Sequence, residues 1–206
     1  MYLILNQRST SRNAYWDGFL SILQDYPVQG LFLEIGAVNP EQTQAHKNIL
    51  DRLIVLDISF ERLDKSTGTS AVSADAQFLP FKDNSFDGII SHHVIEHIDK
   101  DNLFISEIHR ALKKNGFAII GTPNRKRLTR VIIEFFTEKR EFPWWEHKRE
   151  YIKEDLLELM NEGDFKKVII YSKFLGIHTH SLIAGFSRCP RLLERLCNFL
   201  FLVLVK

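Results

Sequence analysis

Two acidic side chains follow apolar runs that have the length of buried strands. The run at 31–35 contains Glu34 and leads into Gly36. The run at 53–56 leads into Asp57, which lies 21 residues after Gly36. In a doubly wound α/β fold, an acid about 20 residues after such a glycine accepts hydrogen bonds from the ribose of a bound nucleotide. The spacing therefore predicts a nucleotide-like ligand at the carboxyl ends of these two strands.

Three histidines follow a later apolar run, and they could transfer protons. His92 and His93 come directly after this predicted fourth strand, and His97 follows in the next turn. Imidazole changes its charge near neutral pH, which suits a general base. We expect at least one of His92 and His93 to face the crevice at the carboxyl edge of the sheet, and one of the three histidines to have a functional role. A solvated histidine at a helix start is the plain alternative. His147 and Tyr151 are further candidates.

His93, Glu96 and His97 also form the pattern H-x-x-E-H, which binds zinc in some hydrolases when it lies on a helix. Here the pattern follows a buried strand, and 206 residues leave little room for the separate domain of such hydrolases. We therefore expect no metal and keep zinc hydrolysis as a remote alternative. A nicotinamide-binding fold is also disfavoured, because G-x-G-x-x-G lacks its second and third glycines after Gly36.

These side chains need a scaffold that brings strand ends together, and the order of the predicted elements provides one. Strands are predicted at 31–35, 53–56, 71–73, 86–91, 117–121, 165–174 and 199–205. Helices are predicted at 13–26, 40–50, 60–65, 101–114, 125–139 and 154–161, with a turn into a helix at 92–98 and a short helix after Pro190. Alternating strands and helices indicate a parallel sheet covered on both faces. Continuous apolar strands agree with that burial.

The composition indicates a single globular domain over residues 1–206, which we expect to be cytoplasmic. Its hydrophobic content of 45% is sufficient for a core. The net charge of +1 gives no reason to expect a nucleic-acid partner. Cys189 and Cys197 are expected to be reduced, and the N-terminus is too short and too weakly basic at its start for a secretory signal.

The C-terminal segment 196–205 is strongly apolar. A membrane-spanning helix needs about 20 such residues, and this segment is shorter. Its aromatic and β-branched residues are typical of a buried strand. A peripheral membrane contact is the minority alternative.

Several short blocks carry a family resemblance through their joint order and spacing. They are L-E-I-G at 33–36, L-D-I-S at 56–59, A-D-A-Q-F-L-P-F at 74–81, N-S-F-D at 84–87, V-I-E-H at 94–97, E-I-H-R-A-L-K-K-N-G at 107–116 and G-T-P-N at 121–124. Over 31–124 the chain resembles class I S-adenosylmethionine-dependent methyltransferases of the small-molecule type (methyltransferase domain 11-like). Residues 151–165 resemble the family more loosely. The resemblance implies an α/β, Rossmann-like three-layer sandwich with a seven-stranded, mostly parallel sheet whose last strand is antiparallel, and cap elements at about 125–152 and 175–198.

The resemblance also implies where S-adenosyl-L-methionine would bind. The turn at Gly36 would pass close to its methionine part, with Glu34 beneath that turn. Asp57 would accept hydrogen bonds from the ribose hydroxyls, and Asp75 with its neighbour would meet the adenine. The full set of cofactor-binding residues that it implies is Glu34, Gly36, Ala37, Asp57, Ile58, Asp75, Ala76, Ser91 and His92.

One block departs from the family pattern, in which the turn usually has three alternating glycines. Val38 and Pro40 stand in place of the second and third. Val38 has a β carbon where bare backbone is expected, and it disfavours positive φ. Either the loop takes another path, or cofactor affinity is lower. This departure supports one alternative function, a non-catalytic cofactor-binding or scaffold protein.

The function that the resemblance implies is in-line methyl transfer to a small-molecule or lipid- or saccharide-like acceptor. Oxygen, nitrogen and carbon acceptors are all compatible, as are a monomer and a homodimer. Aromatic residues of the two cap regions could cover the acceptor or fill a small secondary core: Phe135, Phe136, Phe142, Trp144, Trp145, Tyr171, Phe174, His178 and His180. Basic residues could meet an anionic acceptor or form a solvated helix face: Arg125, Lys126, Arg127 and Arg130.

Overall fold

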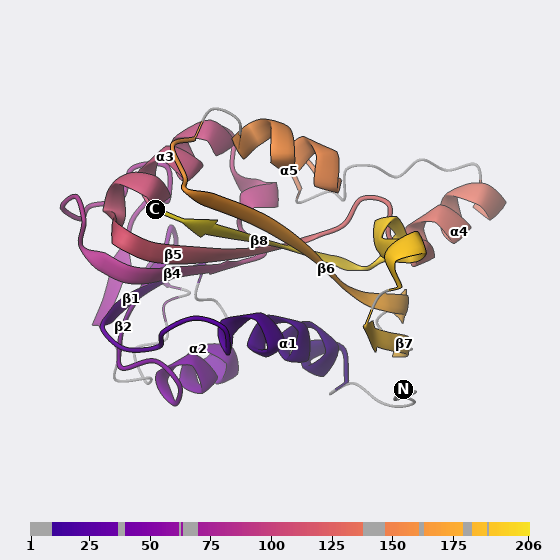
Figure 1. Cartoon of the computed structure of the whole chain (residues 1–206), viewed down its shortest axis with the longest axis horizontal. Helices are drawn as coiled ribbons and strands as arrows, with labels where there is room; N and C mark the ends of the chain where they lie inside the picture. Colours follow the sequence, from indigo (N-terminus) through magenta and orange to yellow (C-terminus); the bar gives the residue numbers. More distant parts are fainter. Residues whose placement is uncertain are drawn as a thin grey trace.

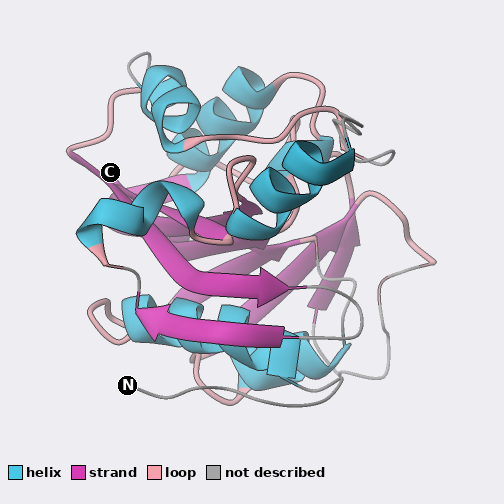
Figure 2. Cartoon of the chain, turned by 90° about the vertical axis from the view of Figure 1, so that its right-hand side faces the viewer, coloured by secondary structure: helices cyan, strands magenta, loops and turns pink. Residues whose placement is uncertain are grey.

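A computed structural model describes residues 10–36, 40–61, 63, 70–137, 147–160, 163–178, 183–188 and 190–206. Within them, eight strands form one sheet in the order β3-β2-β1-β4-β5-β8-β6-β7. Helices cover both faces of this sheet (Figures 1 and 2). The predicted Rossmann-like three-layer sandwich is therefore confirmed.

Five parallel strands form the first part of the sheet. They are β1 (Leu31–Ile35), β2 (Arg52–Asp57), β3 (Ser70–Ser73), β4 (Phe86–His92) and β5 (Leu112–Pro123). β1 pairs with β2 on one side and with β4 on the other. The chain thus proceeds outward from β1 in one direction and from β4 in the other. In such folds, the crevice between these two carboxyl ends is where ligands bind.

The second part of the sheet is antiparallel and contains one strand that the sequence analysis does not predict. β8 (Phe199–Val205) lies between β5 and β6 (Lys167–His178) and runs antiparallel to both, as predicted for the last strand. β7 (Ile183–Arg188) forms a hairpin with the end of β6. The sheet therefore has eight strands instead of the predicted seven. β7 was not predicted because this edge strand lacks the continuous apolar run of the buried strands.

The helices are divided between the two faces of the sheet and its carboxyl edge. α1 (Thr10–Leu23) and α2 (Pro40–Lys47) cover one face, and α3 (Asp101–Ala111) and α5 (Lys153–Met160) cover the other (Figure 1). α4 (Leu128–Thr137) projects beyond the end of β5, next to the short 3₁₀ helix η3 (Arg191–Leu196). Both elements lie in the regions predicted to form a cap.

Consecutive residues of the central strands point to opposite faces, so each strand contributes to two cores. Phe32 of β1 packs in the core beneath α1 with Phe19. Leu33, the next residue, packs in the core on the α3 side with Phe104. This double burial explains why the strands appear in the sequence as unbroken apolar runs.

Arg110 of α3 fixes the loop after β3, which carries Asp75. Its guanidinium donates to the carbonyl oxygens of Phe81 (2.8 Å) and Leu79 (3.0 Å) and to the carboxylate of Glu107 (2.7 Å). The Glu107 carboxylate accepts the Leu79 N–H at 2.7 Å. The block E-I-H-R therefore positions this loop through charge-assisted hydrogen bonds.

Two local elements differ from the prediction. α3 ends at Ala111, earlier than the predicted Lys114, and Asn115 takes the expected left-handed conformation (φ 65°) within β5. Residues 92–98 contain a 3₁₀ turn, η2 (Ile95–His97), instead of an α-helix. Ile95 and Glu96 are both buried, and a tight turn can direct two adjacent side chains inward. The predicted helix at 60–65 falls largely outside the described residues.

The C-terminal apolar run is a core strand, as predicted. Residues 200–204 of β8 are at most 1% exposed, so they offer no surface for the alternative membrane contact. No helix in the described parts of the chain is long and apolar enough to cross a membrane. Cys197, which we expected to be reduced, is disulfide-bonded. Cys189 lies outside the described residues.

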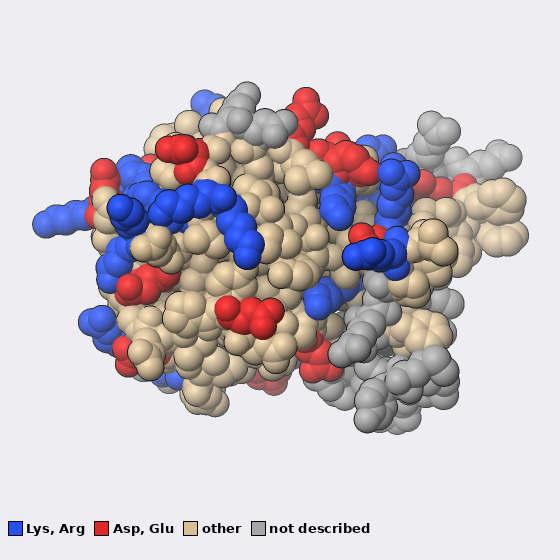
Figure 3. All heavy atoms as spheres, viewed as in Figure 1, with Lys and Arg blue, Asp and Glu red and all other residues tan. Residues whose placement is uncertain are grey.

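Charged side chains of both signs lie interspersed on the face drawn in Figure 3. Several form ion pairs between elements, such as Arg149 with Asp101 at 2.6 Å and Lys113 with Asp87 at 2.8 Å. A mixed surface of this kind agrees with the net charge of +1. The absence of a nucleic-acid partner stays a prediction.

Candidate active site

The turn after β1 lies against the segment that follows β4. Gly36 has a φ of +82°, and a Cβ at this position would collide with Cγ2 of Val94. Glycine avoids both the strained dihedral and the collision. The Gly36 N–H donates to the carbonyl of Leu56 at 2.8 Å, which ties the turn to the end of β2. The glycine of the first block is therefore required by the fold, and it brings the predicted cofactor turn beside residues 92–97.

The remainder of this turn, including Ala37 and Val38, lies outside the described residues. The predicted cofactor contact of Ala37 and the effect of the altered glycines stay predictions. Pro40 is the first residue of α2, as predicted from its fixed φ and missing N–H.

Asp57 ends β2 at the same edge of the sheet. Its carboxylate is buried, and Oδ1 accepts the N–H of Ser59 at 2.8 Å. Oδ2 has no partner among the described residues, so it can accept a hydrogen bond from a ligand hydroxyl. Ile58 is 71% exposed and offers an apolar surface next to this carboxylate. Together they suit a ribose with a flat base beside it.

Asp75 is less available than the sequence suggests. Its carboxylate accepts the backbone N–H of Gln77 at 2.8 Å and the side-chain amide of Gln77 at 3.1 Å. Ala76 is buried beside it. A contact between this turn and an adenine would use backbone groups or would displace the Gln77 amide.

Four buried polar side chains form a chain from β1 to α1. The Tyr15 hydroxyl is 2.7 Å from Nδ1 of His92, and Nε2 of His92 is 3.3 Å from Nε2 of His46. Nδ1 of His46 is 3.0 Å from Oε2 of Glu34, which is an ion-pair distance, although the two atoms are not aligned for a hydrogen bond. Burial, followed by the charges of His46 and His93, holds the pKa of His92 well below its ordinary value.

His92 and Ser91 therefore do not present free groups at the crevice. Both ring nitrogens of His92 have partners, and its side chain is covered by α1 and α2. Ser91 is fully buried, and its Oγ has no hydrogen-bond partner in the described parts of the chain. Of the three predicted histidines, His92 is the one whose surroundings are those of a positioning group.

His93 is the histidine that β4 presents at its carboxyl edge. Its φ of +54° is unusual for a residue with a β carbon, and its N–H donates to the carbonyl of Gly121 at 2.9 Å. The side chain is 41% exposed, with Nδ1 3.1 Å from Oε1 of the fully buried Glu96. The Thr122 hydroxyl donates to the other oxygen of Glu96 at 3.0 Å. A carboxylate at Nδ1 favours the tautomer that leaves Nε2 free to accept a proton.

His97 lies on the exposed side of η2, next to a residue 50 positions later in the sequence. Its ring centroid is 4.9 Å from that of His147, with the planes inclined by 82°. Nδ1 of His147 is 3.1 Å from Oε1 of Glu150. Because η2 is a 3₁₀ turn, His93 and His97 do not occupy successive turns of one α-helix. The helical geometry of an H-x-x-E-H hydrolase is therefore not formed.

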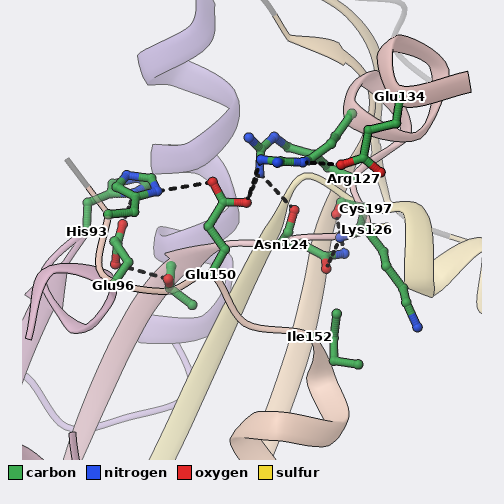
Figure 4. Close-up of polar contacts among 12 residues, drawn as sticks. His93, Glu96, Asn124, Lys126, Arg127, Glu134, Glu150, Ile152 and Cys197 are labelled. Carbon is green, nitrogen blue, oxygen red and sulfur yellow. Dashed lines mark hydrogen bonds and ion pairs between the residues drawn. The ribbon is translucent and has the colours of Figure 1, made fainter. Parts of the chain in front are cut away.

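Glu150 connects this histidine pair to the basic residues after β5 (Figure 4). Arg127 and Arg130 each donate to its Oε2 at 3.1 Å. Burial opposes the charge on Glu150, but His147 and the two arginines outweigh it and hold the pKa of this carboxyl below its ordinary value. Two of the four predicted rim cations are thus used inside the protein.

Known proteins of similar sequence include a probable methyltransferase and an uncharacterised protein. Residues 33–120 match the family model described as a methyltransferase domain. A probable S-adenosylmethionine-dependent methyltransferase of Mycolicibacterium smegmatis is 34% identical over 89 residues, which is 43% of this chain and 32% of that one. An uncharacterised protein of Methanocaldococcus jannaschii is 28% identical over 117 residues, 56% of each chain.

The fold agrees with that match. A crystal structure of a methyltransferase from Thermotoga maritima, described as a possible histamine N-methyltransferase, superposes with a TM-score of 0.70 at 22% identity and covers 95% of this chain and 91% of that one. Residues 33–120 thus carry the methyltransferase-domain match, and the chain has the fold of S-adenosylmethionine-dependent methyltransferases. It spans 56% of the length of the Methanocaldococcus relative and 32% of that of the mycobacterial one.

The residues at this edge of the sheet fit S-adenosylmethionine. Gly36 leaves a backbone cradle that a side chain would fill. Asp57 keeps one carboxylate oxygen for a hydroxyl, and Ile58 lies exposed beside it. Gly36, Asp57 and the pair formed by His93 and Glu96 all lie within the matched residues.

Sequence reasoning missed four residues of the candidate site: Tyr15, His46, Thr122 and Glu150. None is part of the histidine or acid pattern at a strand end. Each of the four contacts a site residue that lies between 20 and 77 positions away in the sequence. Glu150 also has a local contact, with His147. The one local signal was His46, a titratable residue on the short helix α2.

The aromatic residues of the predicted caps have different environments. Phe135 and Phe136 on α4 are 79% and 78% exposed, whereas Phe174 is fully buried in the core beneath α1. Phe142, Trp144, Trp145 and His180 lie outside the described residues. At α5 and η3, Lys126 lines a cavity of about 260 Å³ whose other charged residues are Lys153, Glu154, Arg191, Glu194 and Arg195.

Proposed function

We propose that this protein transfers a methyl group from S-adenosylmethionine to a small-molecule acceptor that loses a proton in the reaction. The observation that carries this proposal is the pairing of an accessible His93 with the buried carboxylate of Glu96. The pair lies after β4, beside the turn at Gly36. The proposed base and the proposed cofactor cradle would then be neighbours at the switch point of the sheet.

Bound S-adenosylmethionine supplies a methyl group that is already activated by the sulfonium. The chain has to align the acceptor with it and exclude water. Gly36 and Asp57 would hold the cofactor at the ends of β1 and β2. Nε2 of His93 would accept the proton of the acceptor, and Glu96 would stabilise the resulting imidazolium through Nδ1–H. Thr122 would keep the Glu96 carboxylate in place.

For the acceptor, we propose a small molecule with lipid-like or saccharide-like character. The exposed Phe135 and Phe136 could cover an apolar part. The cavity at Lys126 could hold an anionic part. Its carboxylates, Glu154 and Glu194, pair with Arg195 and Lys153, whereas Lys126 and Arg191 form no ion pair with a described residue. Figure 4 shows Lys126 and Ile152 on the opposite side of Asn124 from His93. An acceptor that used both places would have to be extended.

Calorimetry with S-adenosylmethionine and with its demethylated product tests the cofactor assignment. Asp57→Ala should weaken binding about 10- to 100-fold, because it removes a charged acceptor of hydrogen bonds from the ribose. Asp25→Ala, a change of the same type at the exposed end of α1, should bind as the unchanged protein does. If neither cofactor form binds at millimolar concentration, the enzyme proposal fails and the scaffold alternative remains.

Release of the demethylated cofactor across a panel of hydroxyl and amine acceptors tests the base. With an acceptor that supports turnover, His93→Gln should lower kcat by about 100-fold or more, because a positioned base contributes a factor of this order. His109→Gln on α3 is the matched control. An unchanged pH–rate profile in His93→Gln would show that His93 does not accept the proton.

A further inference from the structure

Glu96, His97 and His147 come together at the carboxyl edge of the sheet. One ligand atom of each lies within 4.8 Å of the others. The H-x-x-E-H pattern contains only the first two, and by itself it gave no reason to expect a metal. The third ligand arrives from the segment before α5, which the fold brings onto η2. We propose that these three residues bind a divalent transition-metal ion.

The two halves of this metal cluster (Glu96, His97 and His147) are held together by backbone hydrogen bonds. The N–H groups of Lys148 and Arg149 donate to the carbonyl oxygen of Glu96 at 2.8 and 3.3 Å. The residues after His147 are thus fixed to the same turn that carries the other two ligands. The three ligand atoms, which lie within 4.8 Å of one another, would have to move closer together to bind an ion.

Two of the three ligands, His147 and Glu96, are also oriented by a further contact. Nδ1 of His147 faces Oε1 of Glu150 at 3.1 Å, which leaves Nε2 for a metal. Arg127 and Arg130 fix Glu150 through its other oxygen. A carboxylate behind a ligating imidazole is the common arrangement around protein-bound metals, because it sets the tautomer and raises the basicity of the ligand. Glu96 is oriented in the same way by Thr122.

The donor set and its exposure indicate the kind of ion and site. Two imidazoles and one carboxylate suit zinc, cobalt, manganese or iron better than magnesium or calcium. Glu96 is fully buried and His147 is 15% exposed, whereas His97 lies at the surface. The cluster is therefore open on one side. Three protein ligands with an open side leave coordination positions for water or for a substrate oxygen.

An ion next to His93 could bind the acceptor during methyl transfer. This role of the ion rests on the proposed function. Oε1 of Glu96 is 3.1 Å from Nδ1 of His93, so the ion would lie close to the proposed base. A metal-bound acceptor hydroxyl would lose its proton to Nε2 of His93. The oxygen would then form its bond to the methyl carbon as the carbon–sulfur bond breaks, and the demethylated cofactor would leave. An acceptor hydroxyl is thereby favoured over a carbon acceptor.

Metal binding can be measured without any acceptor or cofactor. The purified chain is treated with a chelator, dialysed, and titrated with zinc by calorimetry and with cobalt by visible absorption. We expect one equivalent of either ion per chain. His97→Ala, at an exposed position, should weaken binding at least 10-fold. Glu150→Gln should weaken it about 10- to 100-fold, as loss of an oriented contact behind a ligand does.

His109→Ala is the control. His109 lies on α3, where it packs against Phe165 and not against the metal cluster. It should bind metal as the unchanged chain does. No stoichiometric binding at micromolar ion, or equal binding in His97→Ala and the unchanged chain, would overturn the proposal. Cofactor binding measured on the same sample distinguishes this failure from failure of the methyltransferase assignment.

Discussion

Nε2 of His92 lies 3.3 Å from Nε2 of His46, and the two ring planes are inclined by only 6°. One proton must be shared between these two nitrogens. If it is on His92, Nδ1 of His92 accepts from the Tyr15 hydroxyl, and His46 directs its Nδ1–H toward Glu34. The Tyr15 hydroxyl, both ring nitrogens of His92 and Nε2 of His46 then have hydrogen-bond partners, and His92 carries no charge. The chain links α1 and α2 to the strand ends that carry the site.

The stability of the protein should therefore decrease in acid through His92. Burial, with the charges of His46 and His93, holds the pKa of His92 well below its ordinary value. The unfolded chain thus binds a proton that the folded chain does not, below about pH 6.5. The contribution of neutral His92 to the free energy of unfolding is therefore complete above that pH. As the pH falls toward the folded pKa of His92, this free energy decreases by up to about 1.4 kcal/mol per pH unit. Urea unfolding at several pH values measures this slope.

His92→Gln removes the titrating group and should flatten that slope, although the variant is less stable at every pH. Tyr15→Phe keeps the imidazole but removes the hydroxyl that Nδ1 of His92 faces, which should cost about 1–3 kcal/mol. A slope in His92→Gln as steep as in the unchanged chain would assign the acid sensitivity to other groups.

Gly36→Ala should impair both folding and cofactor binding. The added Cβ collides with Val94, and the φ of +82° is unfavourable for alanine. We expect a loss of at least about 1 kcal/mol in the free energy of unfolding and a large loss of affinity for S-adenosylmethionine. Val94→Ala in the same chain removes the collision but not the dihedral strain. The double variant should therefore recover stability in part, and full recovery would contradict the role of the dihedral.

Glu150→Ala should destabilise the fold much more than Glu134→Ala, although both carboxylates bind Arg130. Glu150 is buried and also pairs with Arg127, whereas the Glu134 side chain is 39% exposed. Removing one partner of a buried ion pair costs about 3–5 kcal/mol, and an exposed pair contributes about 0–1 kcal/mol. Chemical unfolding of the two variants side by side measures the difference. Similar losses would mean that the buried pair contributes little.

Phe135→Ser and Phe136→Ser should leave the free energy of unfolding within about 0.5 kcal/mol of the unchanged value, because both rings are exposed on α4. Phe174→Ala, in the core beneath α1, should cost about 3–5 kcal/mol. If the exposed pair contacts the acceptor, its loss raises KM without a change in melting temperature. A large drop in stability would place these rings in a packed core instead.

The strands and the glycine turn of the proposed cofactor half of the site could be predicted from local sequence. A strand buried on both faces needs an unbroken apolar run, so β1, β2 and β4 were recognisable from residues near 31, 53 and 86. A left-handed turn against Val94 needs a glycine, and this requirement marks Gly36. The acids that come at the ends of parallel strands are then expected at the same edge of the sheet, because these strands run in one direction. The edge hairpin strand β7 carries no such signal and was missed.

The proton-transfer half was decided by the tertiary structure. His92 and His93 are neighbours in the sequence, yet one is enclosed by α1 and α2 and the other is presented at the edge. His147 reaches His97 only because backbone hydrogen bonds to Glu96 dock its segment on η2. The sequence by itself determined the parallel strands and the glycine turn after β1, since these depend on local apolar runs and backbone dihedrals. Packing between distant segments determined which histidine is accessible, because burial and hydrogen-bond partners depend on distances that no local pattern encodes.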